Sequence, residues 1–205
     1  RQRHGRLSLY GPMIRLSDAR VVMCAYEVKT VPGGSVECNA ERLDRSLLIC
    51  STDDGYTWEE PIYFDENNFD HNECMVAETE PGKLVAFMRT LSAPHMWTSS
   101  SEDGGRTWAR LSQSNVSAEC PFLLRHSSGA LILGSRGYGT FLRLSFDKGR
   151  SWTEPFRLSP ASAMMAMVEM ADGRVLNIMH EGYRVPGHIR GQFFRVTPDG
   201  PVAAE

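Results

Sequence analysis

The stretch SEDGGRTW, from Ser101 to Trp108, has the composition of a tight turn that ends in a large aromatic side chain. The same frame, Ser-x-Asp-x-Gly-x-Thr/Ser-Trp, recurs as STDDGYTW at 51–58 and as SFDKGRSW at 145–152. In each copy the Asp carboxylate can accept hydrogen bonds from backbone N–H groups of the turn, and the Gly can adopt a positive φ. The closing Trp is predicted to begin an outer strand and to bury its ring between neighbouring sheets, with its N–H bonded to a turn oxygen. The frame therefore predicts a structural role for Asp53, Gly55, Trp58, Asp103, Gly105, Trp108, Asp147, Gly149 and Trp152.

A second pattern recurs beside these frames, and it consists of an apolar strand, a tight turn with Gly or Asp, and another apolar strand. Its copies lie at 14–27, 76–90, 123–136 and 168–182. The Asp frames begin 50 and 44 residues apart, which is the length of a four-stranded propeller blade. The sequence therefore predicts an all-β propeller of four-stranded antiparallel blades in one domain, 1–205. About four blades are visible, with repeats near 10–60, 72–110, 120–155 and 163–200.

The composition predicts a soluble globular chain with one substantial core. Of its 205 residues 41% are hydrophobic, and no run of about 18 apolar residues occurs that could span a membrane. The formal net charge is -3, with acidic and basic residues interspersed. Such a distribution is typical neither of a nucleic-acid interface nor of a polybasic membrane surface, so neither nucleic acid nor membrane is an expected partner.

The five cysteines are scattered without a CxxC pair, and an odd number cannot all pair within the chain. Reduced, mostly buried thiols are expected, which favours the cytoplasm. The chain begins RQRHGR, without Met or an apolar signal segment, which indicates a processed or truncated start. No HExxH, GxGxxG or P-loop motif occurs, so neither a metal nor another cofactor is expected.

The Ser-x-Asp-x-Gly-x-Thr-Trp frame is the Asp-box, and the chain resembles the sialidase (neuraminidase) superfamily of BNR-repeat β-propellers. The resemblance extends from YGPMIRL at 10–16 to HIRGQFFRVTPDG at 188–200. It implies a propeller that is six-bladed in the sialidases, and it implies a glycosidase. Asp-boxes also occur in propellers with unrelated activities, so they indicate architecture more strongly than chemistry.

Topology predicts which end of each blade carries function. In an up-and-down blade the turn between strands one and two and the turn between strands three and four lie at one end. The Asp-boxes therefore lie with the SDAR, EPGK, SSGA and ADGR turns at a structural end, and the site is expected at the opposite end.

Equivalent residues at the end of each second strand are expected to ring one mouth there: Tyr26, Arg89, Arg136 and His180. The first strands begin at the same end and bring in His71, Asn72, Glu73 and Glu119. His71 and Glu73 are predicted to share one strand face near Arg89. Guanidinium forks bind carboxylates, which suits an acidic sugar, while the alternative is that each Arg pairs with a structural Asp or Glu.

Loops at this end supply further candidates. Tyr138 follows Arg136 in the short GYGTF loop and is predicted to line the site. The resemblance places a catalytic Asp in the long first-blade loop, 29–45, where Asp44 stands between Arg42 and Arg45. The alternative for Asp44 is a solvated loop residue. Arg184 and Arg190 flank the fourth-blade loop and are candidates for a third arginine.

The chain departs from the sialidase pattern at two places. The Arg-Ile-Pro motif is matched by Tyr10-Gly-Pro12, which lacks the arginine, and Met164 or Met165 stands where the nucleophilic Tyr is expected. Because methionine cannot act as that nucleophile, hydrolysis would need Glu73 together with a second group such as Asp44 or His180, as acid and base about 5 to 9 Å apart. His71 is the fourth catalytic candidate.

Three functions fit these residues: a sialidase-like glycoside hydrolase acting on a glycan, with an acidic sugar as one candidate; a carbohydrate-binding propeller without turnover; and a protein-binding scaffold. The Arg, His and Glu residues favour the first two, because interaction faces are more often apolar and aromatic. Glu169 is expected to be structural or pocket-lining. RLSLY at 6–10 is expected either to complete the fourth blade in a four-bladed ring or to belong to a six-bladed domain of which two blades lie outside this sequence.

Overall fold

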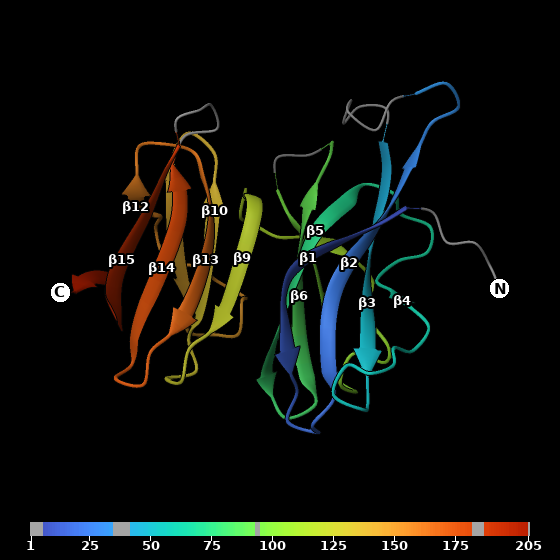
Figure 1. Cartoon of the computed structure of the whole chain (residues 1–205), viewed down its shortest axis with the longest axis horizontal. Coiled ribbons are helices and arrows are strands. Elements are labelled where there is room, and N and C mark those ends of the chain that lie inside the picture. Colours follow the sequence, from blue (N-terminus) through green and yellow to red (C-terminus); the bar gives the residue numbers. More distant parts are fainter. Residues whose placement is uncertain (1–5, 35–41, 93–94, 182–186, 205) are drawn as a thin grey trace. The chain divides into compact units, whose positions relative to one another are not determined.

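The computed structural model describes residues 6–34, 42–92, 95–181 and 187–204, which form four antiparallel four-stranded sheets (Figure 1). Sheet A contains β1 (Arg6–Arg15), β2 (Val21–Thr30), β3 (Arg42–Ser51) and β4 (Ile62–Tyr63), and sheet B contains β5 (His71–Glu80), β6 (Lys83–Thr90), β7 (Trp97–Ser101) and β8 (Ser112–Gln113). Sheet C contains β9 (Glu119–Arg125), β10 (Leu131–Arg136), β11 (Thr140–Ser145) and β12 (Phe156–Ser159), and sheet D contains β13 (Ala163–Glu169), β14 (Arg174–Glu181), β15 (His188–Thr197) and β16 (Gly200–Ala204). Within the described ranges, no helix has the length and apolar character needed to cross a membrane.

Each sheet pairs its strands in the order in which they follow along the chain. Such a meander needs only a turn or a loop between antiparallel neighbours. The predicted four-stranded antiparallel repeats are therefore confirmed.

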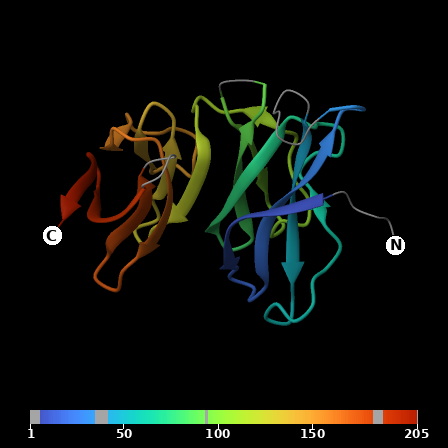
Figure 2. The ribbon, with the colours of Figure 1, turned by 45° about the horizontal axis from the view of Figure 1, so that its top comes forward.

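The chain divides into two compact units, Arg1–Ser117 and Ala118–Glu205, each built from two sheets (Figure 2). In the first unit, apolar side chains of sheets A and B form one core that includes Val22, Cys24, Leu48, Cys50, Cys74, Val76, Leu84, Ala86 and Met88. In the second unit, sheets C and D form another core that includes Ile132, Leu142, Leu144, Met167, Val175, Met179 and Phe194. Both cores arise because alternate residues of each strand point to one face of its sheet.

The second Asp-box shows why this turn is self-contained. Oδ1 of Asp103 accepts the N–H groups of Thr107 and Arg106 at 2.9 and 3.0 Å, and Oδ2 accepts the Thr107 hydroxyl at 2.6 Å. The Ser101 hydroxyl donates to Asp103 Oδ1 and accepts the N–H of Gly105, both at 2.8 Å. Gly105 has φ 83°, a conformation that glycine adopts without strain.

The other two boxes repeat this arrangement. Asp53 accepts the N–H and hydroxyl of Thr57 at 2.8 and 2.6 Å, and Asp147 accepts the same groups of Ser151 at the same distances. The glycines Gly55 and Gly149 have φ 92° and 86°. The predicted role of the Asp and Gly residues is confirmed in all three frames.

The predictions for the tryptophans are confirmed only in part. Trp108 packs against the first core, with its ring centroid 4.5 Å from that of Phe64, and its Nε1 donates to the carbonyl of Gly105 at 3.1 Å. Trp58 is 37% exposed, so the prediction of burial is wrong for this residue. The prediction that each Trp begins an outer strand is also wrong, because β4, β8 and β12 start four residues later. In two sheets a proline, Pro61 or Pro155, directly precedes the strand, but β8 starts at the same distance from its Trp without one.

The two ends of the described chain correct one expectation. The RLSLY segment lies in β1 and pairs with β2, so Leu7 stands opposite Glu27. Sheet D obtains its outer strand, β16, from the turn that follows Thr197. RLSLY as the outer strand of the fourth blade is therefore wrong, because the chain turns back and supplies that strand itself.

Both described ends of the 29–45 segment lie in strands. β2 extends to Thr30 and β3 begins at Arg42, so Asp44 pairs with Val28 inside the sheet. Residues 35–41 lie outside the described ranges. Both expectations for Asp44 as a loop residue, catalytic or solvated, are wrong in this respect.

Two glutamates join neighbouring blades at the turn end. Glu78 of β5 accepts the N–H of Ser17 at 2.7 Å and its hydroxyl at 2.8 Å, which ties the β1–β2 turn to sheet B. Glu169 of β13 accepts the N–H of Ser127 at 2.8 Å, which ties the β9–β10 turn to sheet D. Of the two expectations for Glu169, the structural one is therefore confirmed.

Candidate functional site

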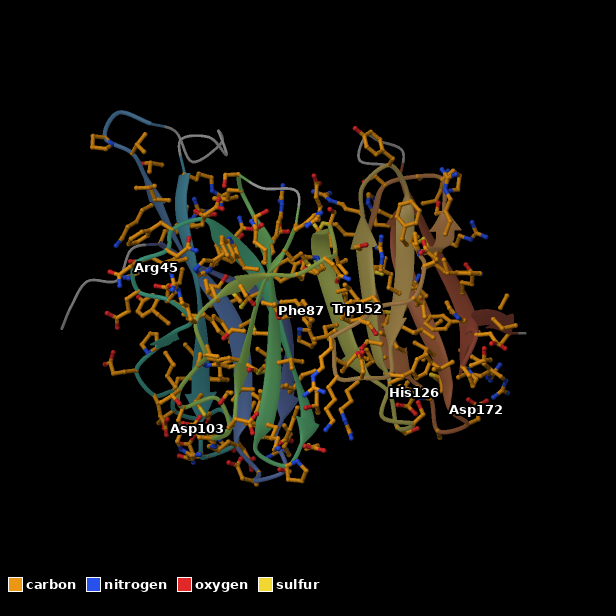
Figure 3. All side chains as sticks on the ribbon, turned by 180° about the vertical axis from the view of Figure 1, so that it is seen from behind. Arg45, Phe87, Asp103, His126, Trp152 and Asp172 are labelled. Atoms are coloured by element: carbon orange, nitrogen blue, oxygen red, sulfur yellow. The ribbon has the colours of Figure 1, made fainter. Side chains whose placement is uncertain are left out.

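The Asp-boxes and the hairpin turns share one end of their sheets, as predicted. The N–H of Gly104 donates to the carbonyl of Gly82 at 2.7 Å, and Nη2 of Arg20 donates to the carbonyl of Gly104 at 2.6 Å. Figure 3 shows Asp103 at this end of the first unit, away from Arg45, and shows His126 and Asp172 at the turn end of the second unit. The predicted catalytic and sugar-binding residues that the structure describes lie at or beyond the other ends of the strands, which we call the ligand end.

A β-bulge interrupts the first strand in three sheets, and in β5 and β9 it lies at the ligand end. The register shifts between Tyr10 and Ile14 in β1, between Asn72 and Met75 in β5, and opposite Gly134–Arg136 in β9. The bulges place Gly11, Glu73 and Cys120 at φ 75°, 47° and 46°. A left-handed conformation is costly for a residue other than glycine, and such strain clusters at functional sites.

Glu73 and Arg89 form an ion pair at this bulge. Nη1 of Arg89 lies 3.1 Å from Oε1 of Glu73, and the two side chains are 17% and 13% exposed. Arg89 stands opposite Asn72, so the bulge turns the next residue, Glu73, towards the guanidinium. For Arg89, pairing with an acidic residue is therefore confirmed. The pair retains some exposure to solvent, and it offers both a carboxylate and N–H donors.

Asp44 is fully buried and is linked to this pair through Asn72. Its Oδ2 accepts Nδ2 of Asn72 at 2.9 Å, and its carboxylate is bound by Nε of Arg42 at 3.2 Å and by Nη2 of Arg42. The guanidinium of Arg42 lies 6.0 Å from the centroid of the half-buried Tyr26 ring. Asp44 thus connects β3 to Asn72, the residue that precedes Glu73.

His71 is also fully buried, and its surroundings keep it neutral. Its Nδ1 accepts the N–H of Ser46 at 2.9 Å, which requires that nitrogen to be unprotonated. Burial lowers the pKa of His71 to about 4, although the negative charges of Asp65 and Asp70 oppose the shift. His71 joins sheet B to β3, whereas Glu73 turns to Arg89. The expectation that they share one strand face is wrong, because the bulge interrupts the alternation of side chains.

The second unit carries the remaining candidates. Nε of Arg136 lies 3.7 Å from Oε2 of Glu119, so this arginine also stands beside a carboxylate. Tyr138 is 100% exposed at the tip of the β10–β11 loop. His180 is exposed on β14 opposite Met164, which is 48% exposed.

Arg190 is exposed on β15, and Arg184 lies outside the described residues. The predicted ring of Tyr26, Arg89, Arg136 and His180 draws on both units and stays a prediction. Sequence reasoning did not assign the partners Arg42 and Asn72 of Asp44. The sequence did contain one indication: residues two apart on a strand share a face, so Arg42 stands on the same face as Asp44.

The cysteines and the groups that could bind a metal were the remaining candidates. Cys24, Cys50, Cys74 and Cys120 are buried free thiols, as expected, and Cys38 lies outside the described ranges. In the part of the chain that the structure describes, no group of three or more His, Cys, Asp and Glu side chains is arranged to hold a metal ion.

Comparison with protein families gives a match to the BNR repeat-like domain over residues 9–175. The chain belongs to this family. Among curated proteins no match was found for the BNR chain.

Solved structures with the same fold extend this result. A protein of unknown function from Dyadobacter fermentans is 20% identical, with a TM-score of 0.73 over 91% of the BNR chain and 53% of its own length. The NanB sialidase of Streptococcus pneumoniae is 18% identical, with a TM-score of 0.66 over 85% and 28% of the two chains. The GH93 α-L-arabinofuranosidase of Fusarium graminearum, solved with arabinobiose, is 14% identical, with a TM-score of 0.63 over 95% and 65%.

These likenesses confirm the sialidase-type β-propeller fold of the BNR chain. At these identities they establish the fold alone. The BNR chain spans about half of the Dyadobacter protein and 28% of the sialidase.

Proposed function

We propose that this chain belongs to a sialidase-like glycoside hydrolase that binds and cleaves a glycan at the ligand end, with Glu73 and Arg89 as the central contacts. The observation that carries the proposal is the ion pair itself. It is largely desolvated, it still reaches solvent, and it sits on a bulge whose left-handed residue is a glutamate. The equivalent bulge of sheet C carries Cys120 at nearly the same φ, so the proposal is supported by the glutamate at this position and not by the backbone strain itself. Two of the structures with the same fold are a sialidase and an arabinofuranosidase.

In this proposal Glu73 transfers the proton and Arg89 orients the sugar. A glutamate can act as a general acid or base when its carboxylate reaches the glycosidic oxygen or a water molecule. Asp44 and His71 are fully buried and hydrogen-bonded. We assign them the positioning of the Asn72–Glu73 bulge instead of contact with the substrate.

The second unit contributes by repeat position. Arg136 and His180 each follow the glycine of their hairpin turn by seven residues, as Arg89 does. Considered within the second unit alone, Arg136 remains a proposed sugar contact and His180 a proposed contact or proton-transfer group. Tyr138, Tyr26, Arg184 and Arg190 remain proposed sugar contacts, because aromatic rings and guanidinium groups suit the apolar and hydroxyl faces of sugars.

A carbohydrate-binding propeller without turnover is the second candidate function. It is favoured by the burial of Asp44 and His71, which removes two of the four proposed acid or base groups from solvent. The exposed Met164 points the same way, since it stands where the resemblance places a nucleophile.

A hydrolysis screen separates the two functions. The chain and its Glu73→Gln and Arg89→Ala variants are assayed on aryl glycosides of neutral sugars, uronic acids and sialic acid, with sugar binding measured in parallel. A hydrolase would lose about 10²-fold or more of its rate in Glu73→Gln while still binding sugar. Glu80→Gln is the matched control, because Glu80 lies on the same strand at the turn end, 3.4 Å from Lys83.

Binding that depends on Arg89, without release from any glycoside, would establish the second function. If no glycoside is cleaved and no sugar binds, both functions are contradicted.

A further inference from the structure

Three arginines at the ligand end of the first unit are paired with carboxylates. They lie on β3 and β6, their side chains are mostly buried, and each contacts an acidic side chain. The pairs are Arg42 with Asp44, Arg45 with Glu27 at 2.7 Å, and Arg89 with Glu73 at 3.1 Å. Glu27 and Asp44 are themselves buried. The charges of these residues therefore cancel within the protein.

This pairing changes what Arg89 can recognise. A ligand carboxylate that bound the Arg89 guanidinium would stand next to the carboxylate of Glu73, whose Oε1 lies 3.1 Å from Nη1 of the same guanidinium. Two like charges so close repel each other, and the repulsion is strong because the pair is largely removed from solvent. The attraction of Arg89 for a carboxylate is therefore offset by Glu73.

A hydroxyl group fits the same pair without this conflict. It can donate its hydrogen to the carboxylate of Glu73 and accept an N–H of Arg89 through its oxygen. Hydrogen bonds to charged partners are the stronger ones, and here both partners are charged. Neighbouring hydroxyls of a sugar ring are the groups that use both halves of the pair.

The second unit shows the same matching in its own strands. Nε of Arg136 lies 3.7 Å from Oε2 of Glu119. This arginine stands at the repeat position of Arg89, seven residues after its turn glycine. An acidic side chain therefore lies near the arginine of this repeat position in sheet C as well as in sheet B.

We infer that the sugar bound at Arg89 is neutral and is recognised through its hydroxyl groups, in place of the acidic sugar that the arginines alone predict. This inference rests on the proposed function, because it concerns the same ion pair. It assigns Glu73 a part in selecting the substrate as well as in proton transfer.

The test compares sugars that differ only in their charge. Aryl glucosides and aryl glucuronides share every ring hydroxyl and differ at C6, where a hydroxymethyl group replaces a carboxylate; galactosides and galacturonides form a second matched set. Both anomers are assayed, with an aryl sialoside alongside. We expect kcat/KM, or 1/Kd if there is no turnover, to favour the neutral member of a set by about tenfold or more. A tenfold preference for the uronide or the sialoside would overturn the inference while leaving the proposed function in place.

The Glu73→Gln variant tests the cause of the preference. Its amide removes the negative charge and keeps the shape, so Arg89 becomes available to a carboxylate. We expect the binding ratio of uronide to neutral sugar to rise by about tenfold in Glu73→Gln. The ratio should stay constant in Glu80→Gln, which removes a charge from the other end of β5.

An unchanged ratio in Glu73→Gln would overturn the inference even if the wild-type chain prefers neutral sugars. A circular dichroism spectrum matching wild type shows that the variant is folded. Failure of every sugar to bind or react would overturn the proposed function, and this inference with it.

Discussion

Replacement of Asp103 tests whether the Asp-box holds the turn end of the blade together. Asp103 accepts hydrogen bonds from four groups: the Ser101 hydroxyl, the N–H groups of Arg106 and Thr107, and the Thr107 hydroxyl. Asp103→Ala removes all four acceptor contacts, whereas Asp103→Asn keeps an acceptor oxygen and removes the charge. The two variants therefore separate the hydrogen bonds from the charge.

The size of each effect follows from these contacts. A hydrogen bond contributes about 1 kcal/mol net, and water can replace part of this at a half-buried turn, so Asp103→Ala should lower the free energy of unfolding by about 3 kcal/mol. The hydrogen bonds from the Thr107 side chain and backbone, followed by those from Ser101 and Arg106, lower the pKa of Asp103 to about 2, although burial opposes them. After a discount for solvent screening, the charge contributes about 1 kcal/mol, which Asp103→Asn should lose.

The pH dependence has a definite sign. Because the folded pKa lies below the ordinary value of 3.8, the contribution of Asp103 is complete at neutral pH and is lost as the pH falls from about 4 through about 2. The assay is urea unfolding at pH 7 and at several acid pH values, with midpoint and slope fitted separately. Glu102→Gln is the control, since this neighbour is strongly exposed and should change stability by less than about 0.5 kcal/mol. A loss below about 0.5 kcal/mol in Asp103→Ala would refute the structural role of the box.

Three further predictions concern contacts between the sheets of the first unit. Arg20→Ala removes the bond to the Gly104 carbonyl and should cost about 3 kcal/mol in the free energy of unfolding, measured in urea. His71 has a folded pKa of about 4 against 6.5 when unfolded, so stability should fall by about 3 kcal/mol as the pH falls from 6.5 to 4, and this slope should disappear in His71→Asn. Asn72→Ala removes the donor to Asp44 and should lower the free energy of unfolding by about 1 to 2 kcal/mol. If the bulge positions the reactive group, kcat should fall while KM changes little. The same fall in kcat in other variants of similar stability would contradict that role.

The turn end could be predicted because its contacts are local in sequence. Each Asp-box bonds within four residues, for example from Asp53 to Thr57, so a short motif contains the whole structural unit. The repeat spacing then gives the number of strands in a blade. The outer strands were placed too early because nothing in the box itself shows where the ladder begins again after Trp58.

The ligand end could be predicted only as a set of positions. Asp44 meets Asn72 and His71 meets Ser46 across 28 and 25 residues, and such contacts depend on how one sheet packs on the next. A sequence pattern shows which residues stand at the ends of strands. It does not show that two of the acidic and histidine candidates become buried partners of the backbone and of other side chains.

The sequence singles out Glu73 by its chemistry and by its place near Arg89, but it does not show the bulge that carries this residue. Glu73 and Cys120 occupy the same repeat position, nine residues before their turn glycines, and both adopt a left-handed φ near 46°. One is a partly exposed carboxylate that pairs with an arginine, and the other is a buried thiol. The backbone strain therefore belongs to the blade, which bends its first strand in this way whatever side chain it carries. The bend is common to both sheets, so the chemical difference between the two positions lies in the side chain. Cysteine occupies the bend as well as glutamate does. The bend therefore does not explain why a charged side chain stands at a largely desolvated position, where a charge is costly. This contrast supports the ligand-binding role that we propose for Glu73, since the bend of the strand is met equally well by cysteine.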